Sequence, residues 1–403
     1  MIVAGGTYRE EITSEGLSEE LGGSAFRAAV AIRAERLVTA LEPSLEETVR
    51  SAAQIVGFEL HNVGRDKAVG FTYLSSFLEP MIRGVGARLD ASLIAQGDSV
   101  LAFGMIEAGD MQIKAKSLVY DPQSADDDIL RTIGASSFER LAICANVEEV
   151  LALGGADSLE SSALALMGQL GAEVVVVKAG ARGCLVIDAD RLEWVGARPT
   201  TTVRKLGSGD IFSAAFALLW TNGWDAVAAA RRASRIAGWW CGGRASTIPD
   251  ELFSDGTLDD GNELQNHGRS PLVYLAGPFF TVPERWMVDE CRRFLLQAGA
   301  RVFSPVHDVG IGGVEVAVKD LRGLEDADVV FALLDGWDAG TVFELGWAVH
   351  AGKPCVALLS NPDPIRSTML VGSEVEIYDD VTSAMYRAIW AGLGAKREPS
   401  NAR

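Results

Sequence analysis

The chain has 403 residues, 48% of them hydrophobic and 23% charged, and a formal net charge of −19 at pH 7. At ~150 residues per domain this length predicts two domains, and the apolar content excludes a disordered chain. The acidic balance disfavours nucleic acid or an anionic membrane as a partner, and no apolar run reaches the ~18 residues of a membrane span. The polar start, 1–11, is too short for a secretory signal, so we expect a cytoplasmic enzyme with small-molecule substrates.

In chain order, the first part of the sequence alternates between apolar strand-like runs and helical stretches. The pattern predicts strands at 1–6, 141–145 and 173–178, and helices at 25–41, 158–170, 211–220 and 226–240, whereas 52–118 gives no clear assignment. Buried strands that alternate with helices indicate a parallel sheet covered on both faces.

A polar stretch interrupts this rhythm at 254–271, where Gly, Asp, Asn and Ser dominate and no apolar period persists. Such a stretch is typical of a linker, because it buries too little surface to offset its ordering entropy. The alternation then resumes, with strands expected at 272–276, 301–304, 329–334 and 355–359 and helices at 283–298, 314–326 and 341–351. We therefore predict an α/β protein with two doubly wound domains, 1–253 and 272–403, whose ligands bind at the carboxyl ends of the strands.

The tetrapeptide Gly207-Ser208-Gly209-Asp210 stands directly before the apolar helix expected at 211–220. Its glycines allow consecutive N–H groups to turn toward one point, and the helix adds the positive end of its dipole, so a phosphate fits there. Asp210 is placed to accept the proton of an attacking hydroxyl. The alternative is a simple turn in which Asp210 caps the helix.

Other motifs in the same order favour the first interpretation. Gly22-Gly23 precedes the helix at 25–41, an Asn-x-x-Glu follows one strand, and a Lys-Ala-Gly-Ala-Arg-Gly follows the valine-rich strand. Together with the tetrapeptide they resemble the ribokinase, or PfkB, family of sugar and nucleoside kinases over about 1–253. The resemblance implies a ribokinase-like α/β/α fold that uses ATP and Mg²⁺, with Asp210 as the catalytic base. It further implies that Gly207, Ser208, Gly209, Asn146, Glu149, Lys178 and Gly180 bind the cofactor, with Glu149 acting indirectly on Mg²⁺, and that Glu10, Gly22 and Gly23 bind the substrate.

The chain departs from that family at three places. Arg204-Lys205-Leu206 stands where the family has Asp-Thr-x, Glu10 stands where it has a substrate-binding Asp, and Arg27 replaces its usual Asn. A kinase with an unusual acceptor and a kinase-derived scaffold that binds nucleotide without turnover both remain open.

After the linker, three acids are expected around one strand end. Asp320 lies in the helix before the strand at 329–334, Asp338 in the loop after it, and Glu344 in the first turn of the next helix. Two neighbouring carboxyl groups can divide the work at a glycosidic bond, one attacking the anomeric carbon and the other donating a proton to the leaving group. Each acid alone is also compatible with an ordinary solvated helix residue.

The surrounding motifs are more specific than the acids. The segments YLAGPF at 274–279, FSPVHDVG at 303–310, DGWDAGTVFELG at 335–346 and GKP at 352–354 resemble the nucleoside 2-deoxyribosyltransferase family over about 271–392. The resemblance implies a smaller flavodoxin-like domain without a cofactor, in which Glu344 is the nucleophile and Asp320 protonates or orients the base. Tyr274, Gly277, Phe279, Trp337 and Asp338 are expected to contact the substrate.

Two features bear on a substrate phosphate. Gly277 is followed by Pro278-Phe279-Phe280, which favours an unphosphorylated nucleoside over a 5′-monophosphate. The segment 366–369 instead resembles a loop that reaches into the site of a neighbouring subunit, where a serine, here Ser367, contacts phosphate in the related monophosphate hydrolases. That loop implies a homo-oligomer formed through the C-terminal domain.

The sequence thus favours a bifunctional enzyme of nucleoside metabolism. It would join ATP-dependent phosphorylation of a sugar or nucleoside hydroxyl to cleavage or transfer at an N-glycosidic bond through Glu344, with linked substrates. In one alternative only the C-terminal chemistry operates and the kinase-like domain is a nucleotide-binding regulator. In the other the protein is a non-catalytic nucleotide-binding or defence module.

Overall fold

The computed structural model describes residues 1–13, 18–84, 89, 92–107, 110–125, 128–243, 245–254, 263–265, 268–363 and 365–394. The chain forms two compact units. The first comprises Met1–Ala179, Gly183–Val195 and Lys205–Asp260, and the second comprises Gly180–Arg182, Gly196–Arg204 and Gly261–Arg403. Most of the expected linker, 255–262 and 266–267, lies outside the described residues, so the boundaries 1–253, 254–271 and 272–403 stay a prediction.

The first unit is built on a nine-stranded sheet in the order β13-β12-β11-β10-β9-β8-β1-β4-β5. Its strands are parallel from β11 to β5, and β12 and β13 run antiparallel at one edge. The bounds are Ile2–Ala4 (β1), Arg36–Thr39 (β4), Glu59–Asn62 (β5), Leu93–Phe103 (β8), Met111–Asp121 (β9), Arg140–Asn146 (β10), Val174–Lys178 (β11), Cys184–Ile187 (β12) and Leu192–Val195 (β13).

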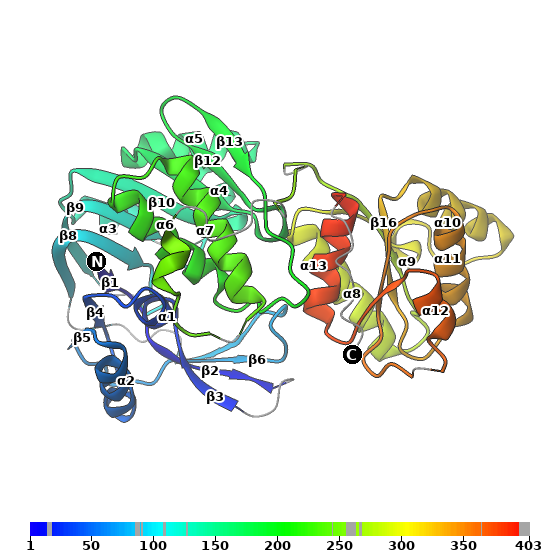
Figure 1. Cartoon of the computed structure of the whole chain (residues 1–403), viewed down its shortest axis with the longest axis horizontal. Coiled ribbons are helices and arrows are strands. Elements are labelled where there is room, and N and C mark those ends of the chain that lie inside the picture. The colour runs from blue at the N-terminus through cyan, green and yellow to red at the C-terminus, as the bar shows by residue number, and fades with distance from the viewer. Residues whose placement is uncertain are drawn as a thin grey trace. The chain divides into compact units, whose positions relative to one another are not determined.

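Helices cover both faces of this sheet, as expected from its continuously apolar strands (Figure 1). Four helices share one core with the sheet, among them α6 and α7, which lie side by side. Three helices pack on the other face. The first group is Ser24–Ala31 (α1), Pro43–Val56 (α2), Ser208–Thr221 (α6) and Ala226–Cys241 (α7), and the second is Ile129–Gly134 (α3), Val147–Gly154 (α4) and Leu159–Leu170 (α5).

The predicted helix at 25–41 is wrong in its second half. Helix α1 ends at Ala31, Arg33 takes a positive φ of 47°, and Arg36–Thr39 forms strand β4 between β1 and β5. A left-handed residue ends a helix, and the buried Leu37-Val38-Thr39 run suits a strand because its branched side chains pack well on a pleated surface.

A separate small sheet in the order β3-β2-β6-β7 belongs to the first unit, and the sequence did not predict it. Its strands are Tyr8–Ile12 (β2), Ser18–Gly22 (β3), Gly70–Tyr73 (β6) and Met81–Arg83 (β7). Strand β2 pairs antiparallel with β3 and parallel with β6, and it carries Glu10, one of the expected substrate-binding residues.

The second unit has a five-stranded, all-parallel sheet in the order β15-β14-β16-β17-β18. Numbered within the unit this is the order 2-1-3-4-5, the flavodoxin-like arrangement, and it confirms the predicted fold. Ligands bind in such sheets where the order reverses, here between β14 and β16. The strands are Leu272–Ala276 (β14), Arg301–Phe303 (β15), Val329–Leu333 (β16), Cys355–Leu358 (β17) and Glu376–Tyr378 (β18).

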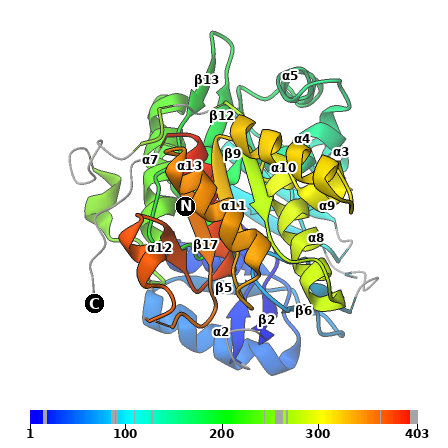
Figure 2. The same cartoon turned by 90° about the vertical axis from the view of Figure 1, so that its right-hand side faces the viewer.

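Six helices accompany this sheet within the described residues, and Figure 2 shows α10 and α11 running beside each other. They are Val282–Gln297 (α8), Pro305–Asp308 (α9), Val314–Asp326 (α10), Ala339–His350 (α11), Thr368–Gly372 (α12) and Val381–Gly392 (α13). Within the described parts of the chain no single helix has the length and apolarity to cross a membrane, and one bent pair, α4 with α5, meets those criteria only when taken together.

Candidate active sites

The tetrapeptide 207–210 lies at the start of helix α6, as predicted. Gly207 is the N-cap residue with a φ of 86°, a left-handed conformation that favours glycine, and no side chain caps the helix. The positive end of the α6 dipole is therefore not neutralised by a capping carboxylate, which leaves it suited to an anion. Asp210 lies in the first turn and is buried, but it does not cap the helix, so the alternative interpretation of this segment is wrong.

The carboxylate of Asp210 forms an ion pair with Arg27, whose guanidinium also pairs with Glu10. Three elements meet in this cluster: α1 supplies Arg27, α6 supplies Asp210 and β2 of the small sheet supplies Glu10. Burial lowers the pKa of Arg27, but the charges of Glu10 and Asp210 together outweigh it and hold that pKa above its usual value. The guanidinium is therefore charged, and it pairs with the carboxylate that is predicted to act as the catalytic base.

Both glycine motifs pack against this cluster. The N–H of Gly23 donates to Glu10 Oε1 at 2.9 Å, and a Cβ added to Gly22 would collide with the carboxyl group of Glu10. A Cβ added to Gly207 would collide with Cδ and Nε of Arg27. The structure thus brings together Glu10, Gly22, Gly23, Gly207 and Asp210, and it adds Arg27 in their midst.

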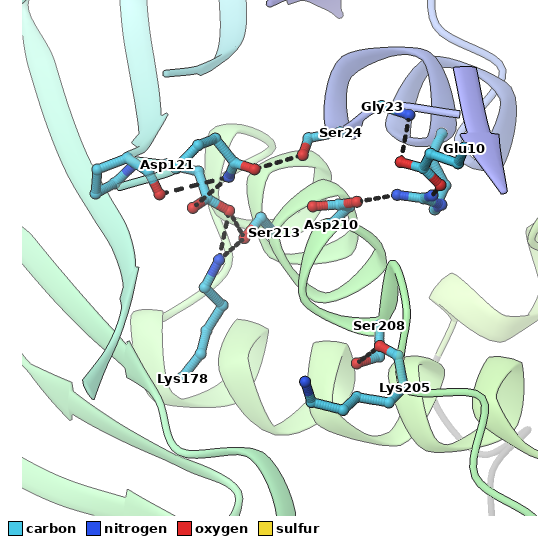
Figure 3. A network of polar contacts seen from close by, with 12 residues as sticks. Glu10, Gly23, Ser24, Asp121, Lys178, Lys205, Ser208, Asp210 and Ser213 are labelled. Atoms are coloured by element: carbon cyan, nitrogen blue, oxygen red, sulfur yellow. Dashed lines mark hydrogen bonds and ion pairs between the residues drawn. The ribbon is translucent and has the colours of Figure 1, made fainter. Parts of the chain in front are cut away.

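A second network lies beside this cluster, where Asp121, Lys178 and Ser213 converge (Figure 3). Asp121 Oδ2 accepts from Lys178 Nζ and from Ser213 Oγ, each at 2.5 Å, and Gln123 connects the other carboxylate oxygen to Ser24. Burial raises the pKa of Asp121 to about 6, although the charge of Lys178 acts in the opposite direction.

Lys178 of this network reaches the tetrapeptide, because a Cβ added to Gly209 would lie 3.7 Å from its Nζ. Burial lowers the pKa of Lys178, but the charge of Asp121 more than compensates and raises it, so the ammonium is positive beside the start of α6. Asp121 and Ser213 were not predicted as site residues from the sequence. The available signals were the position of Asp121 at the carboxyl end of a buried run and that of Ser213 one helical turn after Asp210.

Asn146 and Glu149 form a reciprocal capping box at the start of α4. Asn146 Oδ1 accepts the N–H of Glu149 at 2.9 Å, and Glu149 Oε2 accepts the N–H of Asn146 at 2.8 Å. This pairing gives the motif a local structural role. Across the described part of the chain, no three His, Cys, Asp or Glu side chains gather as a metal site. Magnesium in phosphoryl-transfer sites is held largely by phosphate and water, and the indirect role of Glu149 stays a prediction.

Gly180 was also predicted to bind the cofactor, but its neighbours differ from those of the other predicted cofactor-binding residues. It belongs to the second unit, and a Cβ added to it would lie 3.5 Å from the hydroxyl oxygen of Tyr386. The contacts of Gly180 therefore differ from those of Lys178, two residues earlier.

In the second unit, Tyr274 and Glu344 meet at the point where the strand order reverses. Tyr274 on β14 donates its hydroxyl to Glu344 Oε1 at 2.7 Å, and its ring stacks on Phe303 with centroids 5.4 Å apart. Glu344 lies in the second turn of α11 rather than the first, because this helix begins at Ala339 instead of 341. The full burial of Tyr274 fixes the position of its hydroxyl beside Glu344.

The acids of this site have perturbed titration behaviour. Burial raises the pKa of Glu344 to about 7; the hydrogen bond from Tyr274 opposes that rise, and the charges of Asp320 and Asp338 add to it. Burial also raises the pKa of Asp320, whose Oδ1 is a buried oxygen without a hydrogen-bond partner among the described residues. Tyr274 has a raised pKa because of burial and of the adjacent Glu344 charge, so it is a neutral donor.

The loop between β16 and α11 holds Trp337 and Asp338. Trp337 has a positive φ of 56°, a conformation that costs a bulky residue energy and that occurs preferentially at functional sites. Asp338 is the N-cap of α11, and its Oδ2 accepts from the N–H and hydroxyl of Thr341 at 2.8 and 3.0 Å. Its contact with a sugar hydroxyl stays a prediction.

The remaining expected residues differ in their surroundings. Gly277 follows β14, and a Cβ added there would lie 3.2 Å from side-chain atoms of Leu333, while the ring of Phe279 packs in a tilted arrangement against that of Phe280, with centroids 4.9 Å apart. Ser367 is buried, and its Oγ donates to the carbonyl of Asp363 at 2.6 Å. The hydroxyl of Ser367 therefore donates its hydrogen bond within its own loop.

Two family models match separate parts of the chain. The model of the pfkB family carbohydrate kinases matches residues 100–251, and that of the nucleoside 2-deoxyribosyltransferases matches 273–385. The chain carries a pfkB-like domain followed by a nucleoside 2-deoxyribosyltransferase-like domain. The first match includes Lys178 and Asp210 of the kinase-like unit but not Glu10 or Arg27; the second includes Glu344 and the other acids of the transferase-like unit.

Solved structures with some similarity are kinases. Ribokinase from Thermotoga maritima is 16% identical, with 63% of this chain and 97% of that chain covered and a TM-score of 0.44. Aminoimidazole riboside kinase from Salmonella enterica is also 16% identical, with 62% and 98% covered and a TM-score of 0.46. No curated protein matches the chain.

Proposed function

We propose that the transferase-like unit cleaves or transfers the N-glycosidic bond of a nucleoside or deoxynucleoside through Glu344. The observation that carries this proposal is the cluster in which the buried Tyr274 hydroxyl donates to Glu344 while Asp320 and Asp338 perturb the same carboxyl group. Acids and bases whose pKa values are displaced by burial and charge are typical of catalytic sites.

In the proposed reaction an oxygen of ionised Glu344 attacks the anomeric carbon, and the bond from that carbon to the base nitrogen breaks. The base leaves with the bonding pair and takes a proton from the carboxyl group of Asp320. The hydroxyl of Tyr274 keeps Glu344 oriented and stabilises its anion before attack. Water or a second base then attacks the anomeric carbon, the bond to Glu344 breaks, and the carboxylate is restored.

The test is release of the free base from ribo- and deoxynucleosides and from their 5′-monophosphates, followed by chromatography with and without an acceptor base. We expect Glu344→Gln to abolish release, whereas Glu325→Gln, which alters an exposed acid on α10, leaves it intact. Release that survives Glu344→Gln, or that no substrate shows, would contradict the proposal. Comparing the nucleoside and monophosphate series decides whether the Pro278-Phe279-Phe280 segment excludes phosphate.

We further propose that the kinase-like unit binds ATP with Mg²⁺ against Gly207–Gly209 and Lys178. Mg²⁺ would accompany the phosphates and reduce their charge, with Glu149 acting indirectly. In phosphoryl transfer, Asp210 would take the proton of an acceptor hydroxyl while that oxygen attacks the γ-phosphorus and ADP leaves. Linked substrates follow from the fusion: one unit would phosphorylate the sugar that the other releases, or make the monophosphate that the other cleaves.

The Arg27–Asp210 ion pair favours a second candidate, in which the kinase-like unit binds nucleotide as a regulator without turnover. Magnesium-dependent consumption of ATP in the presence of an acceptor separates the two. A protein that binds nucleotide but neither consumes ATP nor releases base would instead be the non-catalytic nucleotide-binding or defence module.

We also propose a homo-oligomer through the transferase-like unit, in which a second copy covers its exposed apolar side chains. These include Phe280 (72% exposed), Phe343 (63%), Ile365 (85%) and Met369 (77%). Exposed apolar side chains that form one contiguous patch mark an interface, and the proposal requires these four to lie on such a patch. Sedimentation of the full chain beside the Ile365→Glu variant tests this, since the variant should dissociate and a monomeric wild type would refute it.

A further inference from the structure

The proposed acceptor side of the kinase-like unit is closed by a side chain of the chain itself. Arg27 connects Glu10, on the small sheet, with Asp210, on α6, through ion pairs to both carboxylates. All three side chains are largely buried, with exposed fractions of 15%, 10% and 12% for Arg27, Glu10 and Asp210. The guanidinium therefore ties the small sheet to the helix that carries the proposed base.

The same side chain fills the space that the glycines leave. The stem of Arg27 lies against Gly207, and the carboxyl group of Glu10 lies against Gly22, at positions where even a methyl group would collide. Glycines at such positions let another group approach the backbone closely. Here the approaching groups are Arg27 and Glu10.

The charged side chains of this cluster pair with one another. Two carboxylates and one guanidinium give the cluster a net charge of −1, and Tyr73 on β6 faces it as a neutral phenol because burial and the charge of Glu10 raise its pKa. A neutral hydroxyl that displaced Arg27 would leave two buried carboxylates without a cation, which is strongly unfavourable. An anionic acceptor would meet a cluster that is already negative.

We propose that Arg27 determines the specificity of the acceptor pocket by acting as an internal plug that excludes neutral sugars. This inference rests on the proposed function of the kinase-like unit and adds the residue that governs access to Asp210. A neutral sugar enters when the Arg27 side chain leaves its place between Glu10 and Asp210. The nucleotide side, formed by Lys178 and Gly209, is not affected by the plug.

The experiment compares binding of D-ribose and D-fructose to the full chain by calorimetry. The variants are Arg27→Asn and the double variant Glu10→Gln/Arg27→Asn, which keeps the net charge of the cluster at −1 and so protects the fold. Arg33→Asn is the matched control, because Arg33 lies just after α1 in an exposed ion pair with Asp250 and asparagine tolerates its positive φ. ADP formation from ATP and Mg²⁺ is measured in parallel.

We expect at least one of the two sugars to bind at least tenfold more tightly to both Arg27 variants than to wild type or to Arg33→Asn. Equal binding in all forms, including equally weak binding, overturns the plug. The parallel assay separates this inference from the proposed kinase activity. Tighter sugar binding by the variants without ADP formation in any form supports the plug and refutes the kinase activity. ADP formation by wild type with either sugar, at a rate unchanged in the variants, supports the kinase activity and refutes the plug.

Discussion

Replacing Tyr274 by phenylalanine tests the proposed nucleophile most directly. The substitution removes only the hydroxyl that donates to Glu344 Oε1 at 2.7 Å, and it keeps the ring that stacks on Phe303. This hydrogen bond opposes the effect of burial on Glu344, whose pKa is raised to about 7. Its loss therefore raises that pKa further and leaves less ionised carboxylate to attack.

The size of the effect follows from the strength of such a bond. A hydrogen bond to a charged group is worth ~1.5–3 kcal/mol, and one pKa unit corresponds to about 1.36 kcal/mol. The pKa of Glu344 should thus rise by ~1–2 units in Tyr274→Phe, to ~8–9. At pH 7 the ionised fraction falls from roughly one half to ~1–10%, which lowers base release ~5- to 50-fold.

The assay is the pH dependence of base release between pH 5 and 10, with the active nucleoside at concentrations far below saturation. Activity of wild type should rise with pH through about 7, and the rise in Tyr274→Phe should move to higher pH. Tyr386→Phe, a tyrosine on α13 in the same unit, should behave as wild type. An acidic limb at the same pH in Tyr274→Phe and wild type would refute the reasoning.

Three further predictions concern the buried charges. The folded-state pKa of Glu344 is about 7 and its ordinary value is 4.5, so wild-type stability should fall as pH rises between these values. In urea unfolding, Glu344→Gln should therefore be more stable than wild type by up to ~3 kcal/mol at pH 8, with no difference at pH 4. Asp320→Asn should lower base release ~10²- to 10⁴-fold, with the smallest loss for nucleosides whose base leaves most easily, and equal losses across bases would contradict its role as the acid. Lys178→Met should weaken ATP binding, and it should destabilise the protein by ~3–5 kcal/mol because it leaves the buried Asp121 unpaired. The double variant Lys178→Met/Asp121→Asn should recover much of the stability but not the ATP binding.

The fold was predictable where local pattern and tertiary environment agree. Three strands of the transferase-like unit, such as Val329–Leu333, are short, fully apolar runs, so their type and order could be predicted, whereas β18, which reads Glu-Ile-Tyr, was not predicted. The small sheet of the kinase-like unit could not, because β2 reads Tyr-Arg-Glu-Glu-Ile and its charges suggest a loop. Pairing with β3 and β6, together with the ion pair from Glu10 to Arg27, accounts for that strand.

The same division applies to the sites. Glu344, Asp338 and Tyr274 could be placed together because parallel strands end at one edge of the sheet and the acids follow directly. The contacts of Asp210 could not, since its partner Arg27 lies 183 positions earlier and the sequence shows Arg27 only as a departure from a motif. Likewise Asp121 and Lys178 meet across 57 positions. Such pairings depend on how distant elements pack, which no local spacing encodes.

The two sites differ in how their charges are satisfied, and that difference indicates which chemistry the chain is ready to perform. In the kinase-like unit Asp210 has Arg27 and Asp121 has Lys178, so each buried carboxylate already has a cation. Among the described residues of the transferase-like unit, Asp320 has a buried oxygen without a partner and Glu344 has only a neutral phenol, and burial raises the pKa of both acids. Unsatisfied acids cost stability unless a substrate engages them, so they are retained where they serve a reaction. By this argument the proposed glycosidic chemistry needs only its substrate, whereas the proposed phosphoryl transfer first needs Arg27 to move.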